Sequence, residues 1–349
     1  MQNDYGYMQR CLQLAENGSG FVAPNPMVGA VLAYEGKIIG EGWHRKFGEA
    51  HAEVNCINSV MESDRHLIKK STLYVSLEPC SHFGKTPPCA DLIIRCKIKK
   101  VVIGCVDSFA KVNGSGIEKL RNVGVETVLG DWQDECKNFN KRFFTFHQQQ
   151  RPYIILKWAQ TANKKMAYEN NAQRLLISND ITNRLVHRWR SEEAAIIIGK
   201  NTAFADNPAL TNRLWRGKNP TRMVIDKNLE LSANLRVFNN AADTVIFNQL
   251  KEAKQKHLHF CKISFDKNIL PQILRQCYLQ GIQSILVEGG KQLLQSFIDE
   301  KIWDECRIIT NEKILVENGL NAPYISDTAI SKTEYLLSDR VDYYIQSKK

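Results

Sequence analysis

His51-Ala52-Glu53, Glu78-Pro79-Cys80 and Cys89 are the residues that decide the fold of the first half of this 349-residue chain. Together they supply one imidazole, two thiols and carboxylate groups. Zinc favours nitrogen and sulfur donors, and a catalytic zinc site keeps three protein ligands and leaves the fourth position to water. We therefore predict that His51, Cys80 and Cys89 bind Zn2+.

Glu53 lies two residues after His51 and is better placed to carry protons than to bind the metal. A carboxylate beside an activated water can take its proton and return it to a substrate ring. An H-x-E sequence followed by P-C is typical of zinc deaminases that act on nucleobase-like rings, although that signature has a shorter spacing than the eight residues that separate Cys80 from Cys89 here. Glu53 is the predicted catalytic residue.

The predicted helix over 49–61 places His51 and Glu53 in its first turn, and Cys89 opens the next predicted helix. Helix starts direct backbone N–H groups at the metal, and their partial positive charge favours thiolate over thiol. Two alternatives remain open at this point. One is a structural zinc site with His44 or His82 as the fourth ligand. The other is a set of unrelated core residues.

The chain is long enough for two domains of about 150 residues each, and its hydrophobic fraction of 43% supports two packed cores. The polar stretch 147–152 ends in Pro152, which cannot continue a preceding helix, so we predict domains over 1–147 and 151–349. Strands and helices alternate in both, which indicates two α/β units. The predicted helices are 5–16, 49–61, 90–96, 117–122, 131–146, 181–190, 271–280 and 291–299, and the predicted strands are 27–34, 37–43, 71–76, 100–106, 125–129, 153–159, 194–198, 221–226, 243–247, 284–288 and 305–310.

The formal net charge of +10 is compatible with nucleic-acid binding, with affinity for small phosphorylated anions, or with a solvated basic surface. The basic residues are scattered rather than grouped in a run, so we expect a small anionic partner and no nucleic acid.

The chain has no signal segment and no apolar run of membrane-spanning length, so we expect no membrane association and a cytoplasmic location. Most of the ten cysteines stand singly in apolar segments, which is typical of buried free thiols.

The first half resembles the deaminase half of the bifunctional riboflavin-biosynthesis deaminase–reductase family. The matching stretches are Pro24–Gly29, Gly48–Glu53 and Leu77–Cys89, and the eight-residue cysteine spacing is the family's own form. The resemblance implies a cytidine-deaminase-like, three-layer α/β/α fold and a phosphorylated diaminopyrimidinone substrate. It also implies that the substrate pocket is lined by Asn25, His44, His82, Lys85 and Asp107.

The second half resembles the family's reductase, which has a dihydrofolate-reductase-like α/β fold and uses NADPH to reduce a ribosyl group to a ribityl chain. The matching stretches are 152–157, 201–211 and 287–290. No G-x-G-x-x-G follows a strand, so a Rossmann dehydrogenase is not supported. Gly289-Gly290 before a predicted helix can admit a phosphate, although a C-cap or a tight turn is the alternative for that pair on sequence alone.

The resemblance implies two groups of residues in the second half. Lys157, Thr202, Asp206 and Gly290 would lie near NADPH, and Arg190, Leu210, Arg213 and Glu288 would lie near the sugar phosphate. Arg190 and Arg213 suit a phosphate through their planar donor fork, with a charge on a helix surface as the alternative for Arg190. Glu288 ends a buried strand, where a carboxylate needs a partner or ligand.

The chain departs from the family's usual sequence at three places. Asp107-Ser108-Phe109-Ala110 replaces Asp-Pro-Asn-Pro, Asn163–Ala167 replaces Asp-Gly-Arg-x-Ala, and Leu176 replaces a tryptophan. Glycine permits backbone angles that we do not expect of Lys164.

The leading hypothesis is a bifunctional enzyme that works as a homo-oligomer, either a dimer or a tetramer. The alternatives are a deaminase with an inactive second domain and a zinc-stabilised nucleic-acid-binding or editing protein.

Overall fold

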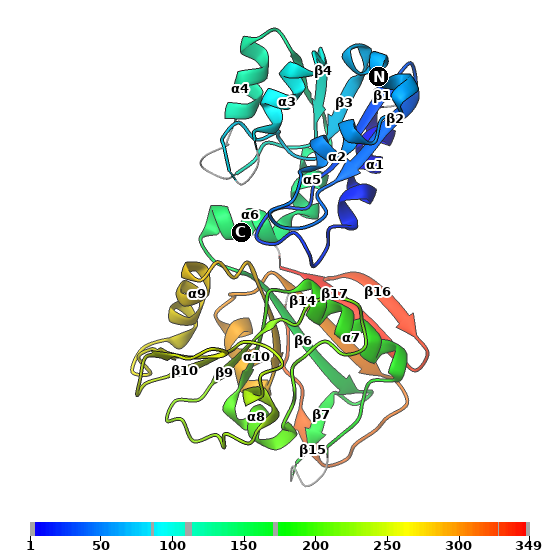
Figure 1. Ribbon diagram of the computed structural model, residues 1–349. Coiled ribbons are helices and arrows are strands. Elements are labelled where there is room, and N and C mark those ends of the chain that lie inside the picture. The colour runs from blue at the N-terminus through cyan, green and yellow to red at the C-terminus, as the bar shows by residue number, and fades with distance from the viewer. Residues whose placement is uncertain (1–3, 85–86, 109–113, 170–173, 327, 347–349) are drawn as a thin grey trace. The chain divides into compact units, whose positions relative to one another are not determined.

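The computed structural model describes residues 4–84, 87–108, 114–169, 174–326 and 328–346. The chain folds into two compact units, Met1–Gln150 and Arg151–Lys349 (Figure 1). Both are α/β units. In the described part of the chain, no helix is long and apolar enough to cross a membrane.

The first unit is built on a five-stranded sheet with the strand order β2-β1-β3-β4-β5. β1 pairs antiparallel with β2 and β3, whereas β3, β4 and β5 run parallel. The elements are α1 (Asp4–Glu16), β1 (Gly29–Tyr34), β2 (Lys37–Trp43), α2 (Ala52–Asn58), the 3-10 helix η1 (Glu62–Lys70), β3 (Thr72–Val75), α3 (Cys89–Arg95), β4 (Lys100–Ile103), α4 (Ser115–Asn122), β5 (Glu126–Leu129), α5 (Gln133–Phe139) and α6 (Lys141–Gln149).

Helices cover both faces of this sheet. Because side chains alternate across a strand, Leu32 and Val31 of β1 point to opposite faces. Leu32 packs in one core with residues of α2, α3 and α4, and Val31 packs in the other with residues of α1, α5 and α6. The unit therefore has the predicted three layers, and the starts of α2 and α3 lie over the same face.

Two predicted helices of this unit were too long. The helix predicted over 49–61 begins only at Ala52, because His51 has an extended backbone (φ −72°, ψ 170°) and caps α2 from outside it. The helix predicted over 131–146 breaks at Asn140 into α5 and α6. The Asn140 side chain bonds instead to the backbone of Met27, with its Oδ1 2.8 Å from the amide nitrogen and its Nδ2 2.8 Å from the carbonyl oxygen.

The second unit is built on a ten-stranded sheet with the order β11-β12-β10-β9-β8-β13-β6-β14-β17-β16, beside a two-stranded sheet of β15 and β7. The elements are β6 (Tyr153–Thr161), β7 (Lys165–Tyr168), α7 (Asp180–Glu192), β8 (Ala195–Gly199), α8 (Lys200–Asp206), β9 (Thr221–Ile225), the 3-10 helix η2 (Arg236–Phe238), β10 (Thr244–Asn248), β11 (Ala253–Lys254), β12 (Leu258–Lys262), α9 (Ile269–Leu279), β13 (Ser284–Gly289), α10 (Lys291–Asp299), β14 (Glu305–Asn311), β15 (Gly319–Asn321), β16 (Ile330–Leu336) and β17 (Asp339–Ile345).

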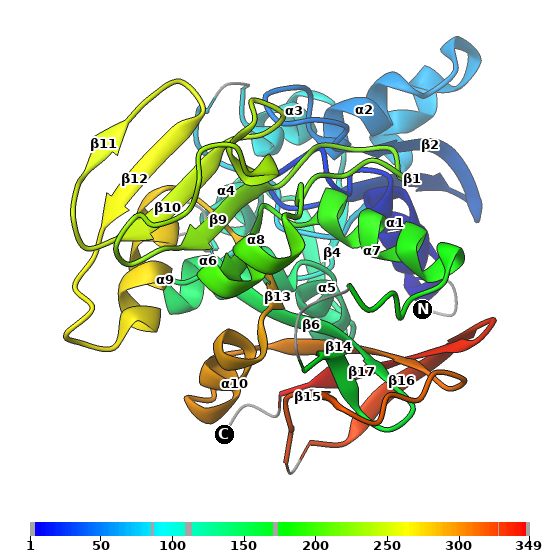
Figure 2. The same ribbon diagram turned by 90° about the horizontal axis from the view of Figure 1, so that it is seen from below.

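The central strands of this sheet are parallel and buried on both faces, as their continuous apolar sequences predict. Ile154 and Leu156 of β6 pack in a core with α9 and α10, whereas Ile155 packs in the core that includes α7 and α8. Helices α9 and α10 therefore cover one face of the large sheet, and α7 and α8 cover the other face (Figure 2). The prediction missed β16 and β17, because their sequences, ISKTEYL and DRVDYYI, carry two and three charged residues and lack a continuous apolar run.

Lys164 occupies the turn between β6 and β7 and has a left-handed backbone, with φ +61°. The expectation that lysine would not adopt the conformation of the family's glycine was therefore wrong. Its amide donates to the carbonyl oxygen of Thr161 over 2.9 Å, and its own carbonyl oxygen accepts from Ala322 over 2.8 Å. These bonds hold the residue in a conformation that is unfavourable for an L side chain by about 1–2 kcal/mol.

Lys164→Gly is expected to stabilise the second unit by roughly 0.5–1 kcal/mol, because relief of the left-handed strain outweighs the greater freedom of unfolded glycine. Urea denaturation followed by tryptophan fluorescence measures the change. Lys165→Gly is the matched control, because Lys165 lies in β7 and glycine weakens a strand. A loss of stability in Lys164→Gly would contradict the expectation.

Candidate active sites

The sequence-predicted zinc ligands come together at the starts of α2 and α3. The Nδ1 atom of His51 lies 3.6 Å from the Cys80 sulfur and 3.4 Å from the Cys89 sulfur. Their ligand atoms all lie within 4.8 Å of one another. Around a tetrahedral centre, a sulfur at ~2.3 Å and a nitrogen at ~2.0 Å from zinc lie ~3.5 Å apart, so this donor set fits the metal.

Neither His44 nor His82 joins this group in the described part of the chain, so the residues there do not form a four-ligand structural site. Three ligands leave a position for water, as a catalytic site requires. Hydrogen bonds with Cys89 and His51 lower the pKa of the Cys80 thiol to about 4 against the opposing effect of burial. The pKa of Cys89 is raised, because its hydrogen bond to Cys80 and its burial favour the thiol.

Glu53 lies in the first turn of α2 and is only 3% exposed. Burial raises the pKa of its carboxyl group, against the attraction of His51. A carboxyl group with a raised pKa holds a proton more readily than an ordinary one and can still release it, which suits a proton carrier. Glu53 also lines the cavity described next.

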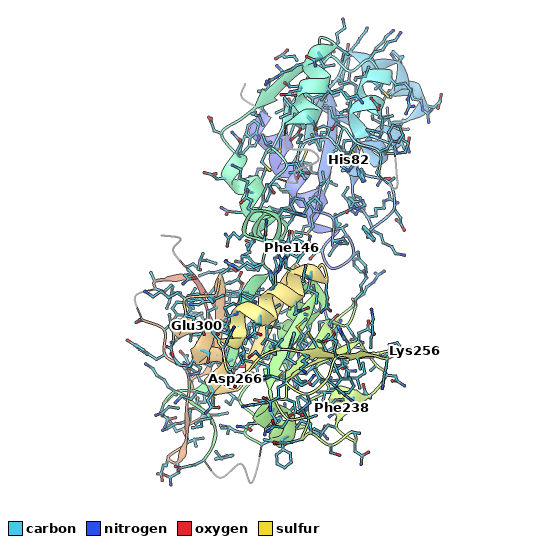
Figure 3. The ribbon with its side chains drawn as sticks, turned by 90° about the vertical axis from the view of Figure 1, so that its left-hand side faces the viewer. His82, Phe146, Phe238, Lys256, Asp266 and Glu300 are labelled. Atoms are coloured by element: carbon cyan, nitrogen blue, oxygen red, sulfur yellow. The ribbon has the colours of Figure 1, made fainter. Side chains whose placement is uncertain are left out.

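A cavity of about 440 Å3 opens beside the ligands, and Asn25, His44, His51, Glu53, His82 and Asp107 are among the residues that line it. His82 is labelled in Figure 3. The structure therefore brings four of the five predicted pocket residues to one cavity. The fifth, Lys85, lies outside the described residues.

His44 and Asn25 are held together at the cavity wall. The Nδ1 atom of His44 lies 3.1 Å from the Ala50 carbonyl oxygen, which can only accept, so Nδ1 carries the proton. Its Nε2 atom then accepts from the Asn25 amide over 3.1 Å. Burial lowers the pKa of His44, which keeps the ring neutral. This arrangement fixes which way the Asn25 amide faces.

Several residues that line the cavity had no predicted role, and three of them, Phe143, His147 and Glu78, carry polar or aromatic side chains. Phe143 and His147 come from α6, with ring centroids 4.4 Å apart. Their spacing of four residues on a helix is a signal that could have paired them. The third is Glu78, which belongs to the quoted motif but had no predicted role.

In the second unit, Arg190 of α7 and Glu288 of β13 form a bidentate ion pair. The guanidinium Nε and Nη2 atoms donate to the two carboxylate oxygens over 2.8 and 2.7 Å. Burial alone would raise the pKa of Glu288, but Arg190 and Lys157 lower it to about 2. The expectation that Glu288 has a partner is confirmed, because Arg190 and Lys157 are both cationic neighbours of its carboxylate. The alternative that Arg190 is a charge on the helix surface is wrong, because its side chain is only 13% exposed.

His187 lies one helical turn before Arg190 and was missed in the sequence. Its Nδ1 atom accepts the backbone N–H of Arg213 over 2.8 Å. Burial and the charges of Arg190 and Arg213 lower the pKa of His187 to about 4, so the ring is neutral. The i, i+3 spacing to Arg190 could have found it.

Thr202 of α8 and Gly290 are neighbours, because a Cβ atom at Gly290 would lie 2.9 Å from the Thr202 Oγ1 atom. Gly290 caps the start of α10, and Gly289 before it has φ +116° and is joined to it by a cis peptide bond. Asp206 is exposed at the end of α8. Leu210 is 2% exposed and its side chain packs in the core, so only its backbone can face a ligand.

Comparison with known proteins matches each unit to a family. Residues 1–105 match the cytidine and deoxycytidylate deaminase zinc-binding region, and residues 152–333 match the RibD C-terminal domain. The riboflavin biosynthesis protein RibD of Aquifex aeolicus is 38% identical over 97% of this chain and 94% of its own length. RibD of Bacillus amyloliquefaciens is 36% identical over 86% of this chain and 82% of its own length.

Solved structures agree over nearly the whole chain. A diaminohydroxyphosphoribosylaminopyrimidine deaminase/5-amino-6-(5-phosphoribosylamino)uracil reductase from Thermotoga maritima is 35% identical, with a TM-score of 0.89 and 99% of both chains covered. RibD of Acinetobacter baumannii is 26% identical, with the same TM-score and coverage. These matches confirm the cytidine-deaminase-like and dihydrofolate-reductase-like folds.

Fold and site together define a zinc-dependent deaminase joined to a reductase. The chain belongs to the RibD family of riboflavin biosynthesis proteins. It is a bifunctional enzyme of riboflavin biosynthesis that acts on a small molecule, and its cofactors are Zn2+ and NADPH.

Proposed function

We propose that the chain converts 2,5-diamino-6-(5-phosphoribosylamino)pyrimidin-4-one to 5-amino-6-(5-phosphoribosylamino)uracil, and then reduces the ribosyl group to a ribityl chain. Residues 1–147 are the deaminase domain and residues 151–349 the reductase domain. The observation that carries the proposal is the three-ligand set of His51, Cys80 and Cys89 beside a cavity that also contains Glu53.

In the deaminase, His51, Cys80 and Cys89 would hold the zinc. When bound, the metal supplies a Lewis acid that makes water a nucleophile near neutral pH. Glu53 would move two protons in turn, the first from the water to the ring nitrogen and the second from the added hydroxyl group to the amino group, which then leaves as ammonia. Its raised pKa favours this repeated uptake and release. Asn25, His44, His82, Lys85 and Asp107 bind the pyrimidine and its ribosyl phosphate, and the fixed Asn25 amide sets the hydrogen-bond pattern for one ring edge.

The reductase domain would hold NADPH, which when bound would supply a hydride for C1 of the opened sugar. Lys157, Thr202, Asp206 and Gly290 bind the cofactor, and the nearness of Thr202 to Gly290 supports one shared surface. Arg190 and Arg213, with the backbone of Leu210, bind the sugar phosphate, and Glu288 lies near it as the ion-pair partner of Arg190. The ion pair with Glu288 orients the Arg190 guanidinium, and the His187 acceptor holds the Arg213 backbone.

The proposed setting is the cytoplasm, with no nucleic-acid partner. None of the ten cysteines, all of which are among the described residues, forms a disulfide, which suits a reducing compartment. We also propose a homo-oligomer, either a dimer or a tetramer. β16 stands at an edge of the large sheet with Ile330 and Tyr335 exposed, and an edge strand can pair with a second copy. Light scattering of the purified protein tests the oligomer.

Mass spectrometry of a time course on the diaminopyrimidinone ribosyl phosphate tests the reaction sequence. With zinc-loaded protein, deamination is expected without NADPH, and reduction only after NADPH is added. Turnover that stops at the deaminated product would instead support an inactive second domain. Complete absence of turnover would overturn the proposal, and steeply salt-dependent RNA or DNA binding would then favour the nucleic-acid alternative.

Removal of zinc with a chelator is expected to abolish deamination and to leave reduction of the supplied deaminated product unchanged. The reason is that the three ligands lie within the first unit, whereas Arg190 and Glu288 lie within the second. Readdition of zinc restores deamination in the same assay. A parallel loss of both activities would contradict this prediction.

A further inference from the structure

Glu78 is a buried carboxylate that accepts four backbone N–H groups. Its Oε2 atom accepts from Asp107 over 3.1 Å and from Gly114 over 2.9 Å. Its Oε1 atom accepts from Gly116 over 2.8 Å and from Ile117 over 3.3 Å. Glu78 itself is 4% exposed, so these bonds are shielded from water. Backbone donors from two separate segments thus converge on one side chain.

These bonds fasten the start of α4 to the zinc-binding motif. The helix begins after Gly114, a left-handed residue with no side-chain cap, so the Glu78 carboxylate serves as its cap. The approach is close, because a Cβ atom at Gly116 would lie 1.9 Å from the Pro79 carbonyl oxygen. A hydrogen bond of 2.6 Å between the Ser81 and Ser115 hydroxyls joins the same two segments.

The same carboxylate also fixes Asp107. The Glu78 amide donates to the Cys105 carbonyl oxygen over 3.0 Å, and the Asp107 amide donates back to the Glu78 side chain. Glu78 therefore holds the backbone at two nearby points, the Cys105 carbonyl oxygen and the Asp107 amide, and Asp107 lines the cavity beside the zinc ligands. Without the carboxylate, the Asp107 backbone loses this anchor while Cys80 keeps its contacts with His51 and Cys89.

We propose that Glu78 is a positioning residue that holds Asp107 in the cavity wall for substrate binding, rather than a ligand or a proton carrier. The inference rests on the proposed deaminase function. Glutamine at this position has nearly the same shape, but its amide group presents donors to two of the four N–H groups. Glu78→Gln is expected to raise KM for deamination by about ten- to a hundredfold, with a smaller effect on kcat and with zinc content unchanged.

A double-mutant cycle with Asp107→Ala separates positioning from general destabilisation. If Glu78 acts through Asp107, the double variant has the KM of Asp107→Ala alone, whereas independent effects multiply. Glu78→Asp, which keeps the charge, is expected to recover part of the loss. Ser81→Ala is the matched control, since it removes a bond between the same segments without touching Asp107. Multiplicative effects, or an unchanged KM in Glu78→Gln, would overturn the proposal.

Amide hydrogen exchange gives a readout that needs no turnover. In Glu78→Gln, the amides of Asp107, Gly114, Gly116 and Ile117 are expected to exchange faster, while those of α2 keep their protection. Unchanged exchange at these four amides would overturn the inference whether or not the substrate proposed above is correct. Failure of the wild-type protein to deaminate would instead count against the proposed function. Reduction of the supplied deaminated product reports on the second unit in every variant.

Discussion

Glu53→Gln is expected to lower kcat for deamination by about two to four orders of magnitude while the protein keeps its zinc. The glutamine amide fills the space of the carboxyl group but cannot take up and release a proton. Zinc is retained because the ligands are His51, Cys80 and Cys89 and not Glu53. The assay is the rate of ammonia release, with metal content measured on the same sample.

The matched control is Glu118→Gln, which makes the same chemical change at an exposed position on α4. It is expected to leave both activities unchanged. Reduction of the supplied deaminated product also stays unchanged in Glu53→Gln, since that reaction uses the second unit. Deamination at a tenth or more of the wild-type rate in Glu53→Gln would remove this residue from the proton-transfer steps.

Glu288→Gln is expected to lower the free energy of unfolding of the second unit by about 3–5 kcal/mol, because it leaves the partly buried Arg190 and Lys157 without their shared anion. Reductase activity falls with it, since the Arg190 guanidinium loses both bonds that orient it. Denaturant unfolding followed by tryptophan fluorescence measures the stability. Glu312→Gln removes the exposed ion pair with Arg340 and serves as the control, with an expected loss below about 1 kcal/mol.

The same ion pair predicts a pH dependence. The folded-state pKa of Glu288 is about 2, below the ordinary value of 4.5. The ionised carboxylate therefore contributes its full stability above pH 4.5, and this contribution is lost as the pH falls toward 2. Wild-type protein is expected to lose stability over that window more steeply than Glu288→Gln. Parallel pH profiles for the two proteins would show that Glu288 is not the group responsible.

The zinc site could be predicted because its residues carry their chemistry in their types and spacing. His51, Cys80 and Cys89 are the donors that zinc prefers, and no contact needs to be known to name them. The central strands of the second unit could also be predicted from the sequence, since strands buried on both faces are continuously apolar. Strands β16 and β17 could not be predicted in this way, because their exposed or charged residues interrupt the apolar pattern.

The rest depends on contacts between residues far apart in the chain. The Arg190–Glu288 pair joins residues 98 positions apart. The resemblance placed both near the sugar phosphate, and burial implied that Glu288 needs a partner, but neither argument identified Arg190 as that partner. The four donors of Glu78 are backbone groups, which every residue except proline carries, so no residue type marks them. The break at Asn140 arises in the same way, because its partner is the Met27 backbone rather than a side chain.

The bond between Asn140 and Met27 also bears on how the protein is made. A nascent chain emerges from the amino terminus, so the backbone of Met27 leaves the ribosome long before the side chain that fastens it, 113 residues later. The backbone of Met27 therefore gains these two bonds only after α5 and Asn140 have been synthesised. A chain that stalls before that helix carries the complete zinc motif but lacks the side chain that bonds to the backbone of Met27.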